Sequence, residues 1–255
     1  MKLLTAIFLT FLTFNSFAQE DNTPKTFKHE SSLSTVKTGG NAVSESYNFA
    51  TDNEYKPGSR EYRFYANYTL SYADDPEVEG IDSEETARNW QVGTQLTQDL
   101  AKKLGGVLGL NYEGNEYAGY EQRENIDAGL KYEFVNTDKL KSSIDVGYRY
   151  TTEKRVLADD EGREVFYFSK GNSRLKGEQK LNTSVSYKVS AQYLPNFTES
   201  EDYQINFEPS LTVKMTDILS LRVAYKAQYD NQLNPGVTEY LDHTTTTAFV
   251  AKFSE

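Results

Sequence analysis

The sequence contains no cysteine, only two histidines, and no apolar run of 18 residues. The lack of cysteine excludes disulfides, so the fold must be held by a core, a metal or a closed hydrogen-bonded barrel. The lack of a long apolar run excludes a membrane-spanning helix. Positive charge is also scarce, with 27 Lys and Arg against 38 Asp and Glu and a net charge of −11. This balance argues against nucleic acid or an anionic lipid surface as a partner.

The N-terminus has the pattern of a secretory signal peptide. Lys2 supplies the positive charge, and Ser16-Phe17-Ala18 fits a small-x-small cleavage site. The apolar stretch between them is about 12 residues, whereas a spanning helix needs about 20. The alternatives are an uncleaved anchor or a buried strand. We expect an exported protein with a signal peptide over 1–18, a flexible lead over 19–26 and one folded domain over 27–255.

Strict alternation of apolar and polar residues is the main pattern in the remaining sequence. From Leu219 to Tyr229, every second residue is apolar or aromatic, and the intervening positions include Arg222 and Lys226. Because side chains of a strand alternate between its two faces, such a run has one apolar and one polar face. Most runs are near the roughly 9–11 residues of a tilted membrane-crossing strand. The 19 tyrosines favour a membrane–water interface.

The alternation predicts nine clear strands and three weak ones. Long loops are expected at 73–85, 153–175 and 230–241, and short turns between them, as in outer-membrane barrels. Both termini on one side require an even number of strands, which supports a total of twelve. The clear strands are 62–72, 90–97, 108–113, 126–134, 144–150, 181–189, 207–215, 219–229 and 245–253; the weak ones are 27–37, 43–51 and 192–197; the turns are 38–41, 52–58, 99–103, 135–139, 190–191 and 215–218.

The same alternation is compatible with a soluble β-sandwich or a lipocalin-like barrel, in which the apolar face points inward. Two observations favour the membrane. Strands end in aromatic residues on the apolar face, as at Tyr72 and Phe134, which is typical of an interfacial girdle. Glycines lie on the polar face, where they relieve crowding in a lumen: Gly93, Gly109, Gly129 and Gly147. The sequence therefore predicts an all-β, antiparallel transmembrane β-barrel of twelve strands in a bacterial outer membrane.

Several segments resemble one family of barrels. They are Tyr187-Lys188-Val189 before Tyr193-Leu194-Pro195, Leu211–Met215 with Thr216-Asp217, Leu219–Tyr229, Asp230-Asn231, Pro235-Gly236, Asp242 before a Thr-rich strand, and the turn Thr38-Gly39-Gly40-Asn41. The chain is similar to the YdiY-like family, domain of unknown function family 481, described as salt-induced outer-membrane proteins. The resemblance implies a twelve-stranded barrel, suggests a link to salt or osmotic stress, and supplies no catalytic residue. Phe253 is similar to the aromatic-ended signal read by the barrel-assembly machinery, although Ser254 and Glu255 follow it.

The predicted lumen carries charges of both signs. Two interpretations stay open: paired charges fill the interior, or a wet lumen sets an ion preference. Barrels of 8 strands are filled and barrels of 16–18 strands are open, so a count of twelve does not decide between a filled and an open interior. The candidate lumen residues are Arg63, Asp127, Lys131, Glu133, Asp145, Arg149, Lys188, Glu208, Lys214, Arg222 and Lys226, with Glu61 and Lys252 in the same pattern.

The sequence gives little support for metal binding or catalysis by the two histidines. His29 and His243 begin strands of opposite direction, so they should lie near opposite rims, and no metal site is expected. Barrel phospholipases and lipid A deacylases use Ser–His constellations on their outer walls. Here Ser31 and residues 244–247 lie near the histidines, but no spacing singles out a triad. We therefore predict a non-enzymatic barrel without a cofactor, and keep a lipid-modifying enzyme as the alternative.

Acidic residues are dense in the segment 73–85, without Lys or Arg. Their oxygens suit loose Ca²⁺ or Mg²⁺ binding, which would bridge to lipopolysaccharide phosphates, but the EF-hand spacing is missing and a solvated loop is the simpler interpretation. A ligand-binding or adhesive role would use this loop and the one at 153–175. The expected partners are outer-membrane lipids, lipopolysaccharide and the assembly machinery, with no nucleic acid, for a monomeric barrel.

Overall fold

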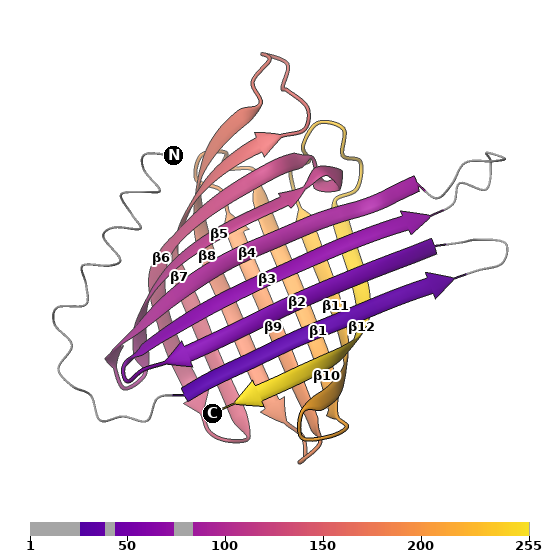
Figure 1. Ribbon diagram of the computed structural model, residues 1–255. Coiled ribbons are helices and arrows are strands. Elements are labelled where there is room, and N and C mark those ends of the chain that lie inside the picture. Colours follow the sequence, from indigo (N-terminus) through magenta and orange to yellow (C-terminus); the bar gives the residue numbers. More distant parts are fainter. Residues whose placement is uncertain (1–25, 39–43, 74–83, 255) are drawn as a thin grey trace.

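The structure is a computed structural model that describes residues 26–38, 44–73 and 84–254. They form one closed antiparallel barrel in which each strand pairs with its neighbours in sequence and the first strand pairs with the last (Figure 1). The predicted twelve strands are thus confirmed. Their bounds are β1 Thr26–Thr38, β2 Ser44–Lys56, β3 Arg60–Ala73, β4 Glu84–Ala101, β5 Leu104–Asn115, β6 Tyr120–Asn136, β7 Leu140–Arg155, β8 Val165–Lys180, β9 Val185–Pro195, β10 Tyr203–Lys214, β11 Leu219–Asp230 and β12 Leu241–Ser254, with the 3₁₀ turn η2 Glu116–Ala118 before β6.

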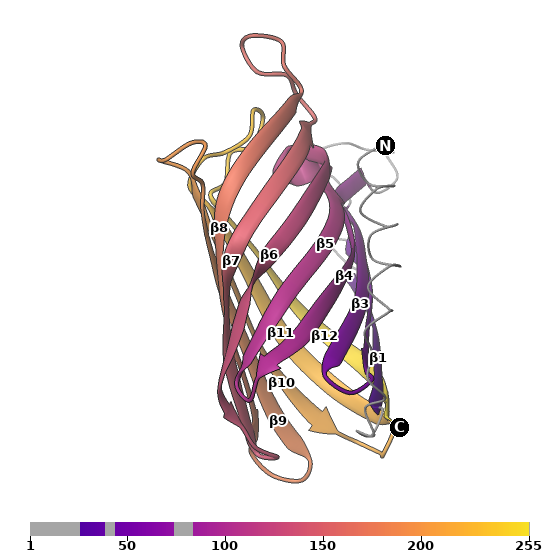
Figure 2. The same cartoon turned by 90° about the vertical axis from the view of Figure 1, so that its left-hand side faces the viewer.

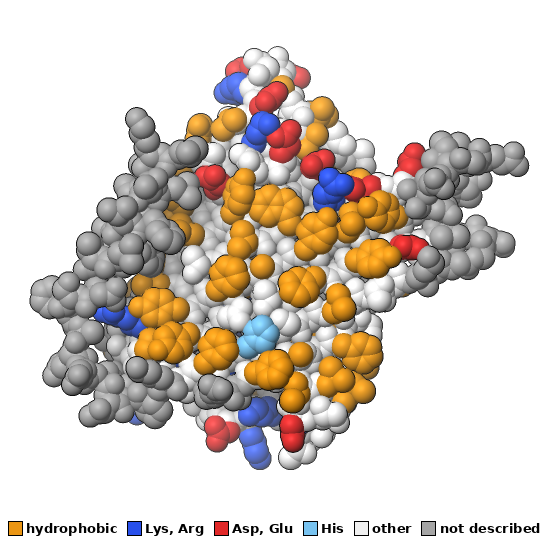
Figure 3. Space-filling model, in the orientation of Figure 1, with side chains coloured by type: hydrophobic (Ala, Val, Ile, Leu, Met, Phe, Trp, Pro, Cys, Tyr) orange, Lys and Arg blue, Asp and Glu red, His pale blue; other side chains and the backbone are white. Residues whose placement is uncertain are grey.

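The apolar face of the strands points outward. Leu33, Phe64 and Phe249 are 61%, 48% and 56% exposed, and hydrophobic side chains cover the wall in Figure 3. The buried hydrophobic residues among those described are only five: Tyr120, Phe168, Leu194, Ala248 and Val250. A soluble sandwich or lipocalin-like barrel would have the opposite distribution, because burial of apolar surface is its main stabilising term. The molecule is therefore a transmembrane β-barrel.

The two ends of the barrel differ in their connections. Short turns at 57–59, 102–103, 137–139, 181–184 and 215–218 close one end, where β1 begins and β12 ends. Longer segments, such as 156–164 and 231–240, lie at the other end, and the strands run between them with a strong tilt (Figure 2). In outer-membrane barrels the short turns are periplasmic. We call the short-turn end the periplasmic rim and the other end the external mouth. None of the described helices is long and apolar enough to cross a membrane.

Three local predictions were wrong. Most of the loop predicted at 153–175 is strand, the end of β7 and the first part of β8, and the connecting segment is only 156–164. The strands predicted at 181–189 and 192–197 are one strand, β9, which contains the turn predicted at 190–191. The turn predicted to begin at Asp52-Asn53 is shorter, because β2 continues to Lys56.

Strand β8 lacks the expected alternation because three consecutive outward positions in its middle are small. Ser169, Gly171 and Ser173 occupy them, where other strands carry Leu, Val or Tyr. Neighbouring strands cover this gap: the hydroxyl of Tyr148 donates a hydrogen bond of 2.7 Å to Ser169 Oγ, and Pro195 packs on Gly171. Because side chains of neighbouring strands supply the apolar cover here, the sequence of β8 alone does not show the alternation.

Other expectations fall on residues outside the described ranges. These are the signal peptide over 1–18, nearly all of the lead over 19–26, the Gly39-Gly40-Asn41 part of the first turn, and most of the acidic segment 73–85. The lead ends within the described part, since Thr26 already belongs to β1. The division of the chain into signal, lead and domain stays a prediction.

Candidate functional site: the polar barrel interior

The barrel encloses a cavity of about 800 Å³ that is lined by side chains from all twelve strands. The lining runs from Lys56 and Lys141 near the periplasmic rim to Asn234 and Glu239 at the external mouth. Thirteen Lys or Arg and eleven Asp or Glu belong to it, although the chain as a whole carries −11. The interior is therefore nearly neutral to slightly positive, and the excess negative charge of the protein lies elsewhere.

Most of the predicted lumen charges lie in the cavity or its wall, and many are paired. Arg63 Nη2 lies 2.6 Å from Asp52 Oδ2, and Lys131 Nζ lies 3.1 Å from Glu133 Oε1. Lys188 is 3.7 Å from Glu178, and Arg222 and Lys252 both contact Glu30. Since an unpaired charge in a dry interior is costly, these pairs allow a charged wall to fold.

Two predicted residues, Asp127 and Asp145, do not line the main cavity. Asp127 accepts hydrogen bonds of 2.9 and 2.8 Å from Arg149, and a third of 2.8 Å from Asn172. Asp145 lies 2.8 Å from Lys176. Both aspartates border a small cavity of about 40 Å³ beside the main one. Each aspartate fixes the position of a basic side chain, Arg149 or Lys176, that lines the lumen.

Three further candidates differ from this arrangement. Glu208 and Lys226 line the main cavity, and no ion pair of either is found among the described residues. Lys214 does not line it; its Nζ lies 2.7 Å from Asp217 Oδ1 in the turn at the periplasmic rim. Lys214 shares a face with the lumen residues, but the strand ends there and the side chain turns to the rim.

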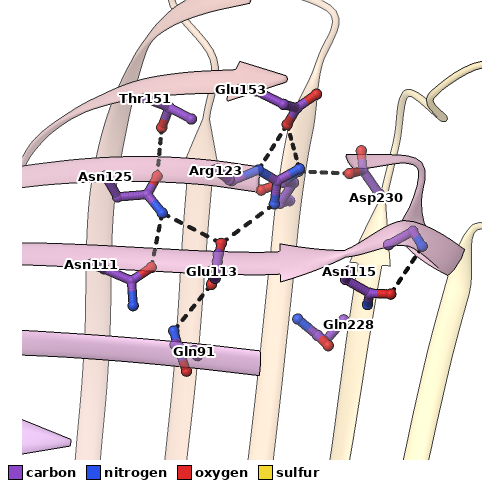
Figure 4. A network of polar contacts seen from close by, with 12 residues as sticks. Gln91, Asn111, Glu113, Asn115, Arg123, Asn125, Thr151, Glu153, Gln228 and Asp230 are labelled. Atoms are coloured by element: carbon purple, nitrogen blue, oxygen red, sulfur yellow. Dashed lines mark hydrogen bonds and ion pairs between the residues drawn. The ribbon is translucent and has the colours of Figure 1, made fainter. Parts of the chain in front are cut away.

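A buried ionic cluster near the external mouth was not predicted from the sequence (Figure 4). Glu153, only 2% exposed, accepts hydrogen bonds from Arg123 Nε at 2.7 Å and Arg155 Nε at 3.1 Å. The guanidinium of Arg123 also stacks 3.8 Å from the ring centroid of Tyr120. These residues extend β6 and β7 beyond the apolar band. Outside the band the outer face is polar too, so the alternation that would have marked the strand disappears.

Amide side chains form a belt of hydrogen bonds around much of the lumen. On one wall, Gln91 donates to Glu113 at 3.1 Å and Asn125 to Asn111 at 3.1 Å (Figure 4). Asn67 donates to Gln91 at 2.8 Å on the same wall. On the other wall the donations are Gln192 to Asn172 at 2.8 Å, Asn206 to Gln192 at 3.2 Å and Gln228 to Asn206 at 3.4 Å. We call this set the amide belt. It presents neutral donors and acceptors between the charged pairs.

One loop reaches across the external mouth. Asn234, in the β11–β12 segment 231–240, donates a hydrogen bond of 3.3 Å to the carbonyl oxygen of Ala118, between β5 and β6. The same segment packs Gly236 against Leu157 of the β7–β8 connection, and its Leu233 and Val237 line the cavity. We call residues 231–240 the mouth loop. It joins opposite sides of the barrel and narrows the external entrance.

The outer wall holds a polar group that the sequence did not single out. His29 and His243 lie near opposite rims, as predicted, since His29 pairs with Phe253 and His243 with Ala227. His29 contacts Ser31 at 3.0 Å and Asn53 at 2.6 Å. Asn53 was missed because it was assigned to a turn. Among the described residues, no group of three or more His, Cys, Asp or Glu is arranged to hold a metal ion.

Comparisons with solved structures return barrels at low similarity. An outer membrane channel from Pseudomonas putida F1 shares 9% identity, covers 92% of this chain and 98% of its own, and has a TM-score of 0.48. The NanC porin shares 10% identity over 91% and 98%, with a TM-score of 0.47. The translocator domain of the autotransporter NalP from Neisseria meningitidis shares 10% over 98% and 94%, with a TM-score of 0.46. No curated protein matches the sequence.

The comparison with protein families identifies one family, whereas the comparison with solved structures returns several kinds of barrel. A family model described as "Protein of unknown function, DUF481" matches residues 31–253. The match begins in β1 and ends in β12, so it covers the whole barrel. The resemblance noted in the sequence is thereby confirmed, and the chain belongs to the DUF481 family.

Proposed function

We propose that the protein is a narrow outer-membrane channel for small hydrophilic solutes. The observation that carries the proposal is the cavity of about 800 Å³, whose polar lining comes from all twelve strands and reaches from the periplasmic rim to the external mouth. A barrel filled for stability alone would place interlocking side chains along the whole axis, as eight-stranded barrels do. Many charges of the wall are paired, and Arg174, Glu208 and Lys226, which have no ion pair among the described residues, need the water that an open lumen supplies.

The lining also indicates the class of solute. Because positive and negative groups nearly balance, the channel should discriminate weakly between anions and cations. The amide belt offers donors and acceptors without charge, which suits hydroxyl-rich neutral molecules such as small sugars. The mouth loop sets the upper limit on solute size.

Two further expectations remain part of the proposal. The barrel closes on itself without an open strand edge, which supports function as a monomer in contact with outer-membrane lipid and lipopolysaccharide. The link to salt or osmotic stress is supported only by the family resemblance. Growth of a deletion strain in high salt, with and without the restored gene, would test that link.

Planar-bilayer recording of the purified, refolded protein tests the channel. We expect discrete conductance steps in salt, and swelling of protein-containing liposomes in small sugars but not in large oligosaccharides. Folding is checked first by the different gel mobility of unheated and boiled protein. Folded protein that shows no conductance at any voltage would overturn the proposal.

A further inference from the structure

Ser31, His29 and Asn53 form a hydrogen-bonded chain on the outer wall of the barrel. The Oδ1 atom of Asn53 lies 2.6 Å from His29 Nδ1, and the Oγ atom of Ser31 lies 3.0 Å from His29 Nε2. An amide oxygen only accepts, so His29 Nδ1 carries the hydrogen and Nε2 is left to accept from the Ser31 hydroxyl. This arrangement has a nucleophile, a base and a third group that orients the base, each within 2.6–3.2 Å of the next.

The orientation of Asn53 is fixed by a fourth residue. Its Nδ2 donates to Thr51 Oγ1 at 3.3 Å, so its Oδ1 must face the histidine. The Ser31 hydroxyl also lies 3.2 Å from Thr51 Oγ1, to which it donates when it does not donate to His29. Thr51 therefore orients both Asn53 and Ser31 by accepting a hydrogen bond from each.

Ser31, His29 and Asn53 face lipid and do not line the lumen cavity, and Thr51 pairs with Ser31 in the β1–β2 register. Their neighbours in sequence, Lys28 and Glu30 on β1, point inward and contact Glu54 and Arg222. Around the cluster lie half-exposed apolar side chains, with Phe253 beside His29 at a ring distance of 5.9 Å. Figure 3, drawn from the β1–β3 side, shows a histidine side chain in the midst of this hydrophobic surface.

The depth of the cluster matches the acyl ester layer of a bilayer. His29 is three positions from Thr26, which pairs with Lys56 at the periplasmic rim. At about 3.3 Å per residue and a tilt of roughly 40°, His29 lies on the order of 8 Å above that rim. Phe27 and Tyr55 lie below the cluster, and Leu33 and Phe49 above it. With the periplasmic rim taken as the surface of the headgroup layer, this depth is where the leaflet passes from headgroups to hydrocarbon.

A purely structural role accounts poorly for this placement. Strands β1 and β2 are already joined by a continuous ladder from Thr26–Lys56 to Thr38–Ser44, so the barrel does not need side-chain hydrogen bonds there. Polar and ionisable groups facing lipid cost free energy and mark functional sites. A leucine or valine at each position would be the stabilising choice.

We propose that Ser31, His29 and Asn53 form a hydrolytic triad that cleaves carboxylic esters of glycerophospholipids in the periplasmic leaflet. The substrate class follows from the placement, because the site opens only toward the bilayer and at the depth of acyl esters. This activity is independent of the channel, since the lumen and the outer wall are separated by the barrel wall.

The reaction needs only the lipid and water. Ser31 Oγ attacks the ester carbonyl carbon while His29 Nε2 takes its proton, and the carbon–oxygen bond to the lipid alcohol breaks as that proton passes to the leaving oxygen. Water then attacks the acyl–Ser31 ester, gives its proton to His29, and releases the fatty acid as Ser31 recovers its proton. Asn53 is a positioning residue that acts through His29.

The first experiment is covalent labelling. Folded full-length protein in detergent is treated with a fluorophosphonate, and the modified peptide is mapped by mass spectrometry. We expect Ser31 to be labelled, and the label to be lost in His29→Ala but kept in His243→Ala, which removes the other outer-wall histidine. Label spread over many serines, or none on Ser31, would overturn the proposal.

The second experiment measures turnover. Fatty acid release is followed from mixed micelles of detergent with phosphatidylethanolamine and phosphatidylglycerol. Ser31→Ala and His29→Ala should each lose at least about 10³-fold in kcat, whereas Ser32→Ala, which alters a lumen-facing neighbour on the same strand, should keep full activity. Asn53→Ala should lower kcat with little change in KM, and Asn53→Asp, which keeps the acceptor, should restore it.

Folding is controlled by gel mobility of every variant before and after boiling. Absence of fatty acid release by the folded wild-type protein, or equal release by wild type and Ser31→Ala, would sink the proposal. Neither result would affect the channel, because these substitutions leave the lumen unchanged and bilayer conductance is measured separately.

Discussion

The side-chain amide of Asn234 donates a hydrogen bond of 3.3 Å to the carbonyl oxygen of Ala118, and this contact joins loops from opposite sides of the barrel mouth. Strands β5 and β6 are six positions from β11 and β12 in the barrel, so the mouth loop must cross the entrance to reach them. Channels that are narrowed by a loop depend on it for their size limit. The proposed channel should therefore be most sensitive to change at this loop.

Replacing residues 232–239 by a short Gly-Ser linker should enlarge the channel. The linker removes Leu233, Asn234 and Val237 from the cavity lining, so single-channel conductance and the largest sugar that enters liposomes should both rise. The matched control shortens 159–163 in the β7–β8 connection, where Gly162 has open space around it, and should leave conductance unchanged. Equal conductance of the mouth-loop variant and wild type would show that the loop is not the constriction.

Ion preference should depend on Arg174, which lines the cavity without an ion pair among the described residues. Arg174→Glu reverses a lumen charge and should shift the reversal potential in a KCl gradient toward cations. Lys214→Glu is the control, because Lys214 lies at the rim beside Asp217 and should have little effect. The shift should shrink in 1 M salt, where the Debye length is about 3 Å. An equal shift in both variants would contradict the assignment of the lumen wall.

Glu153→Gln should strongly destabilise the barrel. The carboxylate is 2% exposed and contacts both Arg123 and Arg155. Its loss leaves Arg155 without an ion pair among the described residues and Arg123 with the longer contact of 3.7 Å to Glu113. Breaking a buried pair costs about 3–5 kcal/mol. Urea unfolding in lipid vesicles, followed by fluorescence of the only tryptophan, Trp90, measures the change.

The control for this substitution is Glu161→Gln. Glu161 pairs with Arg163 at 3.5 Å on an exposed loop, where a salt bridge contributes at most about 1 kcal/mol. If both variants unfold at the wild-type urea concentration, the buried cluster is not a source of stability.

Gly129→Ala should destabilise the wall between β6 and β7. An added methyl group would lie 2.6 Å from the Val146 carbonyl oxygen and 2.8 Å from Gly147 Cα, and backbone atoms cannot move aside cheaply. Overpacking of this kind costs about 1–3 kcal/mol. Gly109→Ala is the matched control, because its nearest neighbour, Asp127 Cβ, would be 3.5 Å away, and it should unfold like wild type.

The sequence predicted the barrel better than it predicted the individual strands. Alternation in β11 and β12 is clear because each outward position except His243 is apolar or threonine, so a single strand carries the signal. In β8, the outward Ser169, Gly171 and Ser173 are covered by Tyr148, Pro195 and Phe197 from neighbouring strands. The resulting surface is complete only after pairing, and no local pattern could have revealed it.

The candidate lumen charges could be chosen by parity alone, because Arg63, Asp127 and Arg222 alternate with apolar residues. Their ion-pair partners could not be predicted from this alternation. Asp127 meets Arg149 through the β6–β7 register, and Glu30 meets Arg222 across β12, where β1 and β12 close the barrel. Register depends on which residues oppose each other, and it is set by all strands together.

By itself, the sequence determined that this protein is a membrane barrel, because side chains that alternate with a period of two distinguish the inward and outward faces of most strands. The tertiary structure decided which residues contact one another on those faces and at the mouth. Asn53 lies 24 positions from His29 in the chain, and only the β1–β2 register places its amide 2.6 Å from the imidazole. Likewise, only barrel closure brings Asn234 to Ala118. Side-chain period is a local property of the backbone, whereas contact between distant residues depends on register and closure.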